Sequence, residues 1–445
     1  MKYLLAEGFR RYCQKQWYND KFYESLQKRR WKNIKHENFN SQFSPGRDDM
    51  RKTTLFCLII LLSLFFAVSV SARPRGLFVG KTFYISGKGD YLFVDEDFPS
   101  QVRQCLNNVR DILKENNMDM ENVVKNWVYL DDLNNFTAMN EVFKEFFPNN
   151  PPARTTIGTG ILPGFEKGGC HIEITSIAYS DLSEIKVIGK VPLGLPFSPG
   201  ILAGDKLYMS GKGDHFPDWS HPATFEEQAR QAMKNVGAIL ADAGLDWRHV
   251  VRADIYLDHI GFINQTVMYK VFSEFFEYGN FPALSTIYVD RIPGDCNIEI
   301  TCIATTDLSE RKVVRPPNMR YGPEGSAPMA SPGVWAGDTL YLSSQTGFDP
   351  VKGLYADDLE TQTRLMMQNH LDVLHEAGLE FKDIVSGYVY LRDMKNYADF
   401  NKLYNSYFEN IDRVRTCIQD NSGYVRDNVT AYTSFIFSPD KRVPQ

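Results

Sequence analysis

Two glutamates stand in segments that are otherwise apolar. Glu173 lies within residues 172–178 and Glu299 within residues 298–304. A carboxylate is costly to bury unless it is paired or hydrogen-bonded, so its presence on an apolar strand favours a functional role. Such a carboxylate can perform proton transfer. Both residues are therefore candidate catalytic groups.

A Ser-Gly turn precedes each glutamate in the chain. Ser86-Gly87-Lys88-Gly89-Asp90 returns unchanged at residues 210–214, which begin with Ser210-Gly211, and more loosely at residues 343–347. Neither serine has a histidine partner in the pattern, and a serine nucleophile needs such a base. We expect both serines to act through the geometry of the turn.

These segments belong to a unit that occurs three times. In the third copy the glutamate segment returns as residues 432–437, with Tyr432 in the place of the glutamate. The copies are a whole domain apart, much longer than the repeat of a solenoid. Three copies of one domain in one chain suggest a covalently linked trimer. We place the domains at residues 73–183, 186–312 and 326–441.

The second copy shows most clearly which elements carry these residues. Apolar residues at every third or fourth position predict helices from Thr224 to the Ala243-Gly244 ending and over residues 262–276. The order of strands and helices predicts an α+β unit with its helices on one face of a sheet. Short runs rich in β-branched and aromatic residues predict strands at residues 207–210, 250–257, 284–289 and 296–304.

Composition allows three cores and excludes some partners. The chain has 445 residues, of which 43% are hydrophobic, enough for three ordinary domains. Its net charge is -6, and no basic stripe is interleaved with aromatic residues. We therefore expect no nucleic-acid partner.

The cysteines predict no metal site. None of the five beyond the N-terminal region forms a CxxC pair or has metal-ligand spacing, so we expect no zinc and no other cofactor. Cys170 and Cys296 hold equivalent positions in two repeats, and a disulfide between them is an open alternative. The five are Cys105, Cys170, Cys296, Cys302 and Cys417.

The N-terminal region stands apart from the repeats. Residues 55–70 form an almost unbroken apolar run between Arg51-Lys52 and a small-residue exit. As a helix this run rises only ~24 Å, short for a bilayer core of ~30 Å. Its length and flanks fit a secretory signal peptide at residues 50–72, with translation beginning at Met50 and residues 1–49 an upstream extension. We expect a secreted protein whose membrane contact is through this segment alone.

Two alternatives remain for this region. Residues 1–49 carry more Lys and Arg than acidic residues, so the positive-inside rule also fits a single-pass type II signal anchor with a cytosolic tail. Both of these interpretations place the repeats outside the cytosol. The third interpretation is a buried core helix at residues 55–70.

Short motifs are dispersed over the repeats: Pro196-Phe197-Ser198-Pro199, Ala203-Gly204-Asp205, Ser210-Gly211, Glu227-Gln228-Ala229-Arg230-Gln231, Ala243-Gly244-Leu245, Pro152-Ala153-Arg154-Thr155 and Ile172-Glu173-Ile174. These motifs resemble those of the RidA/YjgF family, the reactive intermediate deaminases. The resemblance covers all three repeats and implies a chorismate-mutase-like fold. Family members form homotrimers with small-molecule clefts between subunits, so this chain resembles one such trimer made from a single polypeptide, a self-contained pseudo-trimer.

The resemblance implies hydrolysis of imines and enamines such as 2-iminopropanoate to a keto acid and ammonia, as in 2-iminobutanoate/2-iminopropanoate deaminases. An arginine would hold the substrate carboxylate through its planar fork, and a carboxylate would orient the attacking water. By position, the arginines are Arg154 and Arg415 and the carboxylates are Glu173 and Glu299. The groups that frame the substrate are Asn140, Asn401, Ser86, Gly87, Ser210 and Gly211.

Two copies depart from the family pattern. Copy two has Leu284 in place of the arginine and Tyr269 in place of the asparagine, and copy three has Tyr432 in place of the glutamate and Ser344 in place of the glycine. The family's early tyrosine is replaced in every copy, by Arg73, Phe197 and Ala330.

These losses fit clefts shared between neighbouring repeats. If each cleft takes its arginine from one repeat and its glutamate from the next, Arg154 meets Glu299 and Arg415 meets Glu173. Two clefts then stay complete, and the altered positions of copies two and three face each other. If both residues come from one repeat, only copy one is complete.

A second class of function competes with deamination. The missing tyrosine and the altered copies also fit a catalytically degenerate module that binds small carboxylates without turning them over. Ribonuclease activity, which is reported for some family members, has little support in an acidic chain.

Overall fold

The computed structural model describes residues 74–89, 97–163, 170–319, 330–349, 352–421 and 429–444. The predicted extension at residues 1–49 and the predicted signal segment at residues 50–72 lie outside these ranges, as does Arg73.

The expected membrane contact is corrected by the structure. Within the described ranges, no helix is both long and apolar enough to cross a membrane. Long helices such as α4 (Phe98–Glu115) and α9 (Leu359–Ala377) bury one side and carry charged residues on the other. The described ranges therefore give no support to the expected membrane contact.

Each repeat folds as the predicted α+β unit. In the first repeat the sheet runs β1-β2-β5-β3-β4, and α4 and α5 (Phe136–Phe146) connect its strands. β4, which contains Arg154, pairs in parallel with β3 and forms one edge of the sheet. The strands are β1 (Gly76–Val79), β2 (Thr82–Gly89), β3 (Val123–Leu130), β4 (Ala153–Gly158) and β5 (Ile172–Tyr179).

The second and third repeats have the same strand order. The sheets run β7-β8-β12-β10-β11 and β14-β15-β21-β19-β20. The second repeat contains β7 (Gly200–Ala203), β8 (Lys206–Met209), β9 (Lys212–Gly213), α6 (Phe225–Asp242), β10 (Val250–Leu257), α7 (His259–Ile263), α8 (Gln265–Ser273), β11 (Ala283–Tyr288) and β12 (Ile298–Thr305). The third contains β14 (Gly333–Ala336), β15 (Thr339–Leu342), β16 (Gln345–Thr346), β17 (Phe348–Asp349), β18 (Leu354–Tyr355), α9, β19 (Ile384–Leu391), α10 (Tyr397–Ser406), β20 (Val414–Gln419) and β21 (Ala431–Phe437).

Local sequence explains where the helices begin and end. Thr224 and Glu227 form a capping box at the start of α6, and Gly378 ends α9 in the left-handed conformation. The helix predicted over residues 262–276 is instead two helices, α7 and α8. The side chain of Asn264 donates to the carbonyl of Ile260 at 2.9 Å at the point where they separate.

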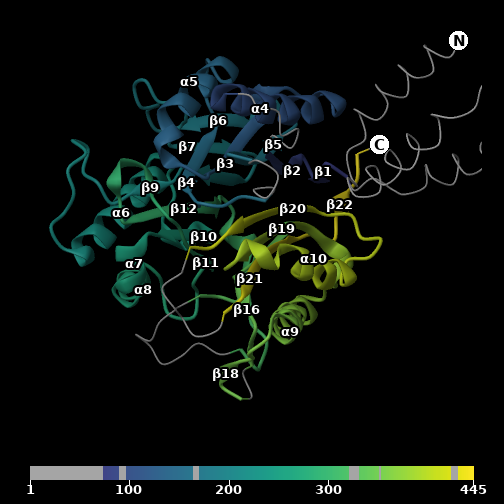
Figure 1. Ribbon diagram of the computed structural model, residues 1–445. Coiled ribbons are helices and arrows are strands. Elements are labelled where there is room, and N and C mark those ends of the chain that lie inside the picture. Colours follow the sequence, from purple (N-terminus) through teal and green to yellow (C-terminus); the bar gives the residue numbers. More distant parts are fainter. Residues whose placement is uncertain are drawn as a thin grey trace, which may run out of the picture. The chain divides into compact units, whose positions relative to one another are not determined.

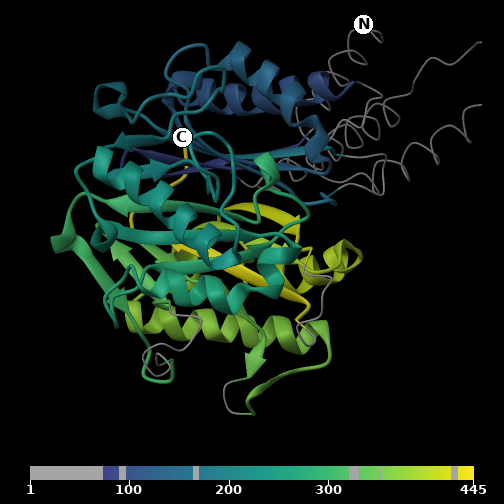
Figure 2. The same ribbon diagram turned by 90° about the vertical axis from the view of Figure 1, so that its left-hand side faces the viewer.

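The central strands are buried on both faces. Every residue of β3, β10 and β19 is buried, as expected for strands covered on two sides. One face of each sheet packs against the helices of its own repeat. Figures 1 and 2 show these helices on the outside and the strands toward the middle.

The other faces of the three sheets share one core. A single cluster of buried residues takes members from all three repeats. Tyr84, Tyr208 and Tyr341 occupy equivalent positions in the repeats and are all buried in it. Burial raises the pKa of the Tyr84 and Tyr341 hydroxyls. The three repeats therefore surround a common centre, as the pseudo-trimer requires.

The C-terminal strand ties the first repeat to the third. In the second and third sheets, the edge strands β6 (Ile185–Ile188) and β13 (Arg311–Val314) come from the preceding linkers. In the first sheet this edge position is taken by β22 (Lys441–Arg442), which pairs with β1. The amine of Lys441 also donates to the carbonyl of Ile384 at 2.9 Å.

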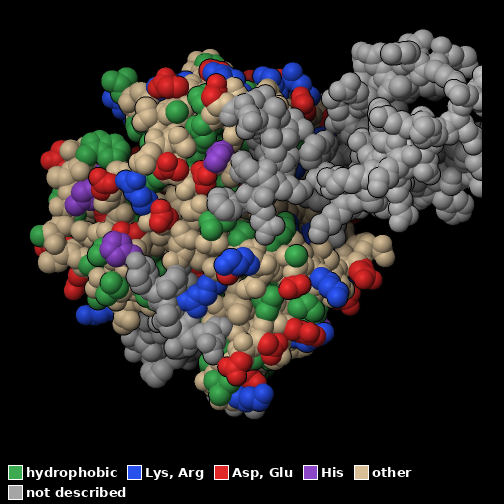
Figure 3. All heavy atoms as spheres, in the orientation of Figure 1, with side chains coloured by type: hydrophobic (Ala, Val, Ile, Leu, Met, Phe, Trp, Pro, Cys, Tyr) green, Lys and Arg blue, Asp and Glu red, His purple; other side chains and the backbone are tan. Residues whose placement is uncertain are grey.

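On the face drawn in Figure 3, acidic and basic side chains are mixed.

Candidate active clefts at the seams between repeats

The seam between the first and second repeats is held by backbone bonds along β4. The amide of Arg154 donates to Oγ of Ser210 at 2.8 Å, and the amide of Gly211 donates to the carbonyl of Arg154 at 3.1 Å. Ser198 adds a third bond, from its amide to the carbonyl of Pro152 at 3.0 Å. The Ser-Gly turn of one repeat is therefore fixed against the arginine of its neighbour.

Arg154 is buried at this seam, and only part of its guanidinium is hydrogen-bonded to side chains of the described ranges. Its Nη2 donates to Oδ1 of Asn140 at 2.6 Å, and the guanidinium lies over the rings of Phe143 and Phe197 at 4.9 and 5.1 Å. Its Nη1 is buried and has no hydrogen-bond partner in the described part of the chain. A buried donor normally has a hydrogen-bond partner, so an anion bound at this seam would supply the missing acceptor for Nη1.

Glu299 of the second repeat lies against the Ser210-Gly211 turn, which is hydrogen-bonded to Arg154. A Cβ on Gly211 would overlap Oε1 of Glu299, so the carboxylate lies directly against the Ser-Gly turn. Burial raises the pKa of Glu299 to about 7, while the charges of Lys125 and Arg154 and the amide of Thr156 act in the opposite direction. The structure thus brings Arg154 of one repeat together with Glu299 of the next.

The seam between the third and first repeats contains a similar set of residues. Arg415 donates through Nη1 to Oδ1 of Asn401 at 2.5 Å, as Arg154 does to Asn140. A Cβ on Gly87 would overlap Oε1 of Glu173 and stand 3.1 Å from Oγ1 of Thr416, the residue after Arg415. Glu173 of the first repeat therefore lies beside the strand of the third repeat that carries Arg415.

The seam between the second and third repeats keeps the scaffold without the chemistry. The amide of Leu284 donates to Oγ of Ser343 at 2.8 Å, and the amide of Ser344 donates to the carbonyl of Leu284 at 3.0 Å. Buried apolar and aromatic side chains take the places of the arginine, asparagine and glutamate. Tyr432 stacks on Tyr390 with ring centroids 4.8 Å apart. This cleft has no charged pair at the equivalent positions.

The two charged clefts differ in how tightly the seam is closed. Ser198 and Ser331 each donate an amide hydrogen across their seams. The equivalent residue of the first repeat is Pro74, which has no amide hydrogen to donate. The hydroxyl of Ser86 donates to the carbonyl of Arg75 in its own repeat at 3.4 Å, whereas the hydroxyl oxygens of Ser210 and Ser343 each accept an amide hydrogen across their seams. Arg415 is correspondingly only half-buried, whereas Arg154 is fully buried.

Three lysines at the clefts were not predicted from the sequence. Lys88 and Lys212 follow the Ser-Gly turns, and burial lowers the pKa of Lys88 to about 8 and that of Lys212 in the same direction. Lys125 donates to Oγ1 of Thr155 and to Oγ1 of Thr301, at 2.7 and 2.9 Å, and so joins two repeats. The third copy lacks both the glutamate and the lysine of the turn, and this coincidence was the signal available in the sequence.

The five cysteines in the described ranges are buried thiols. No disulfide links any of the five that lie in the described ranges, so the alternative of a Cys170–Cys296 bridge is not realised. Cys417 lies beside the charges of Arg415 and Glu173, and burial raises the pKa of its thiol to about 12. A thiol in that state is a poor nucleophile.

Known proteins resemble single repeats of this chain. Human 2-iminobutanoate/2-iminopropanoate deaminase is 35% identical over 115 residues, 25% of this chain and 81% of the human protein. Protein mmf2, mitochondrial, of Schizosaccharomyces pombe is 38% identical over 102 residues, 22% of this chain and 80% of that protein.

Solved structures give a similar result. E. coli TdcF with bound serine is 23% identical, with a TM-score of 0.26 over 28% of this chain and 98% of that one. A chorismatase is 11% identical, with a TM-score of 0.49 over 72% of this chain and 93% of that one.

A family model covers most of the chain. The model described as endoribonuclease L-PSP matches three times, at residues 74–180, 192–306 and 323–422. The chain therefore belongs to this family, which is also known as RidA/YjgF, and contains three copies of its domain.

Proposed function

We propose that the chain hydrolyses reactive imines or enamines of the 2-iminopropanoate type to a keto acid and ammonia, at the two charged clefts. The observation that supports this most directly is the meeting of Arg154 and Glu299, from different repeats, on either side of the Ser210-Gly211 turn. Relatives of single repeats bear the name of this activity.

The chemistry needs one cation, one base and a fixed substrate. The guanidinium of Arg154 binds the substrate carboxylate, with its buried Nη1 as one donor. Glu299 takes a proton from a water molecule as the water oxygen bonds to the imine carbon. Glu299 passes this proton to the imine nitrogen, which gives a carbinolamine. Glu299 then takes the hydroxyl proton as the carbonyl forms and the C–N bond breaks, and transfers it to the departing nitrogen, which leaves as ammonia. Asn140 holds the guanidinium in place.

This proposal predicts a dependence on pH near neutrality. The Arg415→Ala variant leaves the Arg154–Glu299 cleft as the active one. Because burial raises the pKa of Glu299 to about 7, the base is protonated below that pH, and kcat/KM should fall as the pH is lowered through neutrality. A pH profile of kcat/KM tests this. A flat profile across neutral pH would exclude Glu299 as the base.

Gly211→Ala should inactivate the same cleft. The new Cβ would overlap Oε1 of Glu299 and displace the carboxylate. A misplacement of about 1 Å can cost about 100-fold in rate. We expect a loss of that order when kcat/KM is measured in the Arg415→Ala background. Gly237→Ala is the control, because the nearest atom to its Cβ lies 3.6 Å away. Equal activity of the Gly211 and Gly237 variants would contradict the placement of Glu299.

The direct test is to measure release of ammonia and keto acid from freshly generated 2-iminopropanoate, together with keto-acid binding by calorimetry. Deaminase function predicts release above the uncatalysed rate. Binding without release would select the second candidate, a small-carboxylate binding module. One observation favours that candidate: Phe197, in the place of the family's tyrosine, lies over Arg154 and brings no hydroxyl to the cleft.

A further inference from the structure

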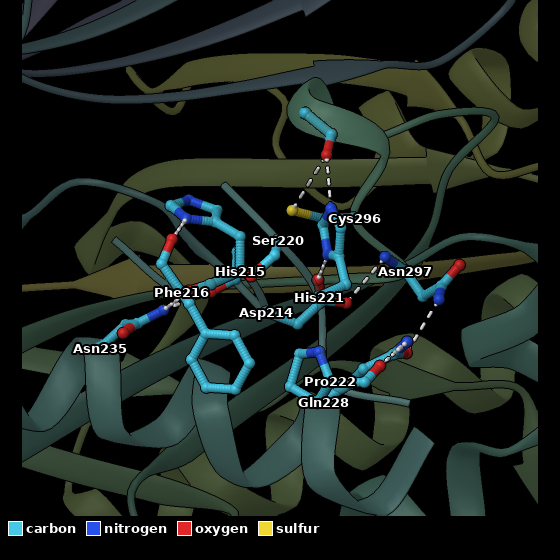
Figure 4. A network of polar contacts seen from close by, with 12 residues as sticks. Asp214, His215, Phe216, Ser220, His221, Pro222, Gln228, Asn235, Cys296 and Asn297 are labelled. Atoms are coloured by element: carbon cyan, nitrogen blue, oxygen red, sulfur yellow. Dashed lines mark hydrogen bonds and ion pairs between the residues drawn. The ribbon is translucent and has the colours of Figure 1, made fainter. Parts of the chain in front are cut away.

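A cluster of potential metal ligands lies beside the first cleft. Asp214, His221 and Cys296 each offer one donor atom, and these atoms lie within 4.8 Å of one another. Asp214 follows β9, His221 lies in the loop before α6, and Cys296 precedes β12, so the fold converges three separate segments (Figure 4). All three side chains belong to the second repeat.

Most polar atoms around His221 are hydrogen-bond acceptors. Nδ1 of His221 lies 2.7 Å from Oδ1 of Asp214, and Nε2 lies 3.0 Å from the carbonyl oxygen of Gly294. Sγ of Cys296 lies 3.9 Å from the same carbonyl. Both ring nitrogens thus face acceptor atoms, an arrangement that one cation could satisfy by replacing a ring proton.

The buried carboxylate is supported from behind. Asp214 is entirely inaccessible to solvent, and its Oδ2 accepts the amide hydrogen of Asn297 at 2.9 Å. The side chain of Asn297 in turn donates to Oε1 of Gln228 on α6 at 2.8 Å. Figure 4 shows this chain of contacts leading away from the cluster. Hydrogen bonds of this outer kind normally orient the ligands of a metal.

We propose that Asp214, His221 and Cys296 bind a divalent transition metal of the zinc type. A thiolate, an imidazole and a carboxylate are ligands that Zn²⁺ accepts in tetrahedral sites. Nδ1 of His221, beside Asp214, would bind the metal, Nε2–H would donate to the carbonyl of Gly294, and a water molecule would be the fourth ligand. The metal would fasten the loop that contains His221 to the turn before β12.

The proposed metal site lies next to the strand that carries Glu299. Cys296 packs against Gly213, where a Cβ would overlap its sulfur, and Gly213 is paired with Glu299 in the sheet. The metal would therefore support the segment that carries Glu299 without contacting the substrate. The first repeat keeps Asp90 and Cys170 but has no histidine at residues 91–97, and the third repeat has Gly347 and Val429 at the positions of Asp214 and Cys296, so only the second repeat has all three ligands.

Cobalt binding to the full chain tests the proposal. We expect Co²⁺ to bind with a stoichiometry of one per chain and to produce a thiolate-to-cobalt charge-transfer band. Cys296→Ser should abolish the band, and His221→Ala should weaken binding at least about tenfold, the lower range for loss of metal-site contacts. Zn²⁺ should compete the cobalt out and raise the Tm of the wild-type chain.

Two control variants separate the site from general effects of substitution. Cys170→Ser removes the equivalent buried cysteine of the first repeat, and His215→Ala removes a neighbouring histidine that stacks on Trp219. Both should keep the cobalt band. A wild-type chain without the band, or a Cys296→Ser chain that retains it, would overturn the proposal. Neither readout depends on deaminase activity.

Discussion

Replacing Arg154 and Arg415 together with alanine should abolish imine hydrolysis, whereas each single replacement should leave one working cleft. Truncating one partner of a buried charge pair costs about 2–5 kcal/mol, which at about 1.4 kcal/mol per factor of ten is at least about a 30-fold loss of kcat/KM in each cleft. Steady-state kinetics on 2-iminopropanoate measure this.

The control for the arginine variants is Arg291→Ala. Arg291 lies at the same seam but is exposed and donates to Asn134 at 3.1 Å instead of entering the cleft. It should keep wild-type activity. Complete loss of activity in Arg154→Ala alone, with the variant still folded by circular dichroism, would leave no role for the second cleft.

Asp254→Ala should be the most destabilising substitution that we can specify. Asp254 and Arg252 form an ion pair at 3.0 Å, and each side chain is only 2% exposed. The guanidinium of Arg252 also lies 4.4 Å from the ring centroid of Tyr388 in the third repeat. Removing the carboxylate leaves a buried cation without its partner, which costs about 3–5 kcal/mol of unfolding free energy.

Chemical denaturation of the Asp254→Ala chain measures this loss. Arg248→Ala is the matched control, because Arg248 pairs with Asp246 at 2.6 Å on the surface, and such pairs contribute about 0–1 kcal/mol. Replacing both Arg252 and Asp254 with leucine should restore much of the stability. If Asp254→Ala were no more destabilising than Arg248→Ala, the shared core would not depend on this pair.

The sequence predicted the fold well because the signal was repeated three times. The helix of α6 has a capping box and apolar residues at helical spacing, and the strands around Val250 and Val251 are β-branched. The split between α7 and α8 was missed, because the hydrogen bond from Asn264 to Ile260 interrupts a pattern that is otherwise continuous.

The candidate clefts were predicted only in part. The pairing of Arg154 with Glu299 was one of two interpretations, since the sequence does not say which repeats face each other. The lysine that joins two repeats, Lys125, could not be foreseen, because its partners Thr155 and Thr301 come together only in the folded chain. The same holds for Asp214, His221 and Cys296, whose spacing along the chain resembles no metal motif.

The location of the protein remains a prediction. The segment at residues 50–72 lies outside the described ranges, so its cleavage as a signal peptide and the secretion of the repeats are untested. N-terminal sequencing of the mature protein would decide whether the chain begins after this segment.

One comparison of two double variants tests directly whether the clefts are built across neighbouring repeats. Arg154→Ala with Glu299→Gln damages a single cleft if the seams are as described, so the Arg415–Glu173 cleft should keep working. Arg154→Ala with Glu173→Gln damages both clefts, and activity should disappear. Loss of activity in both double variants, with each still folded, would contradict this account and show that Arg154 works with the glutamate of its own repeat, because only the first copy is then complete.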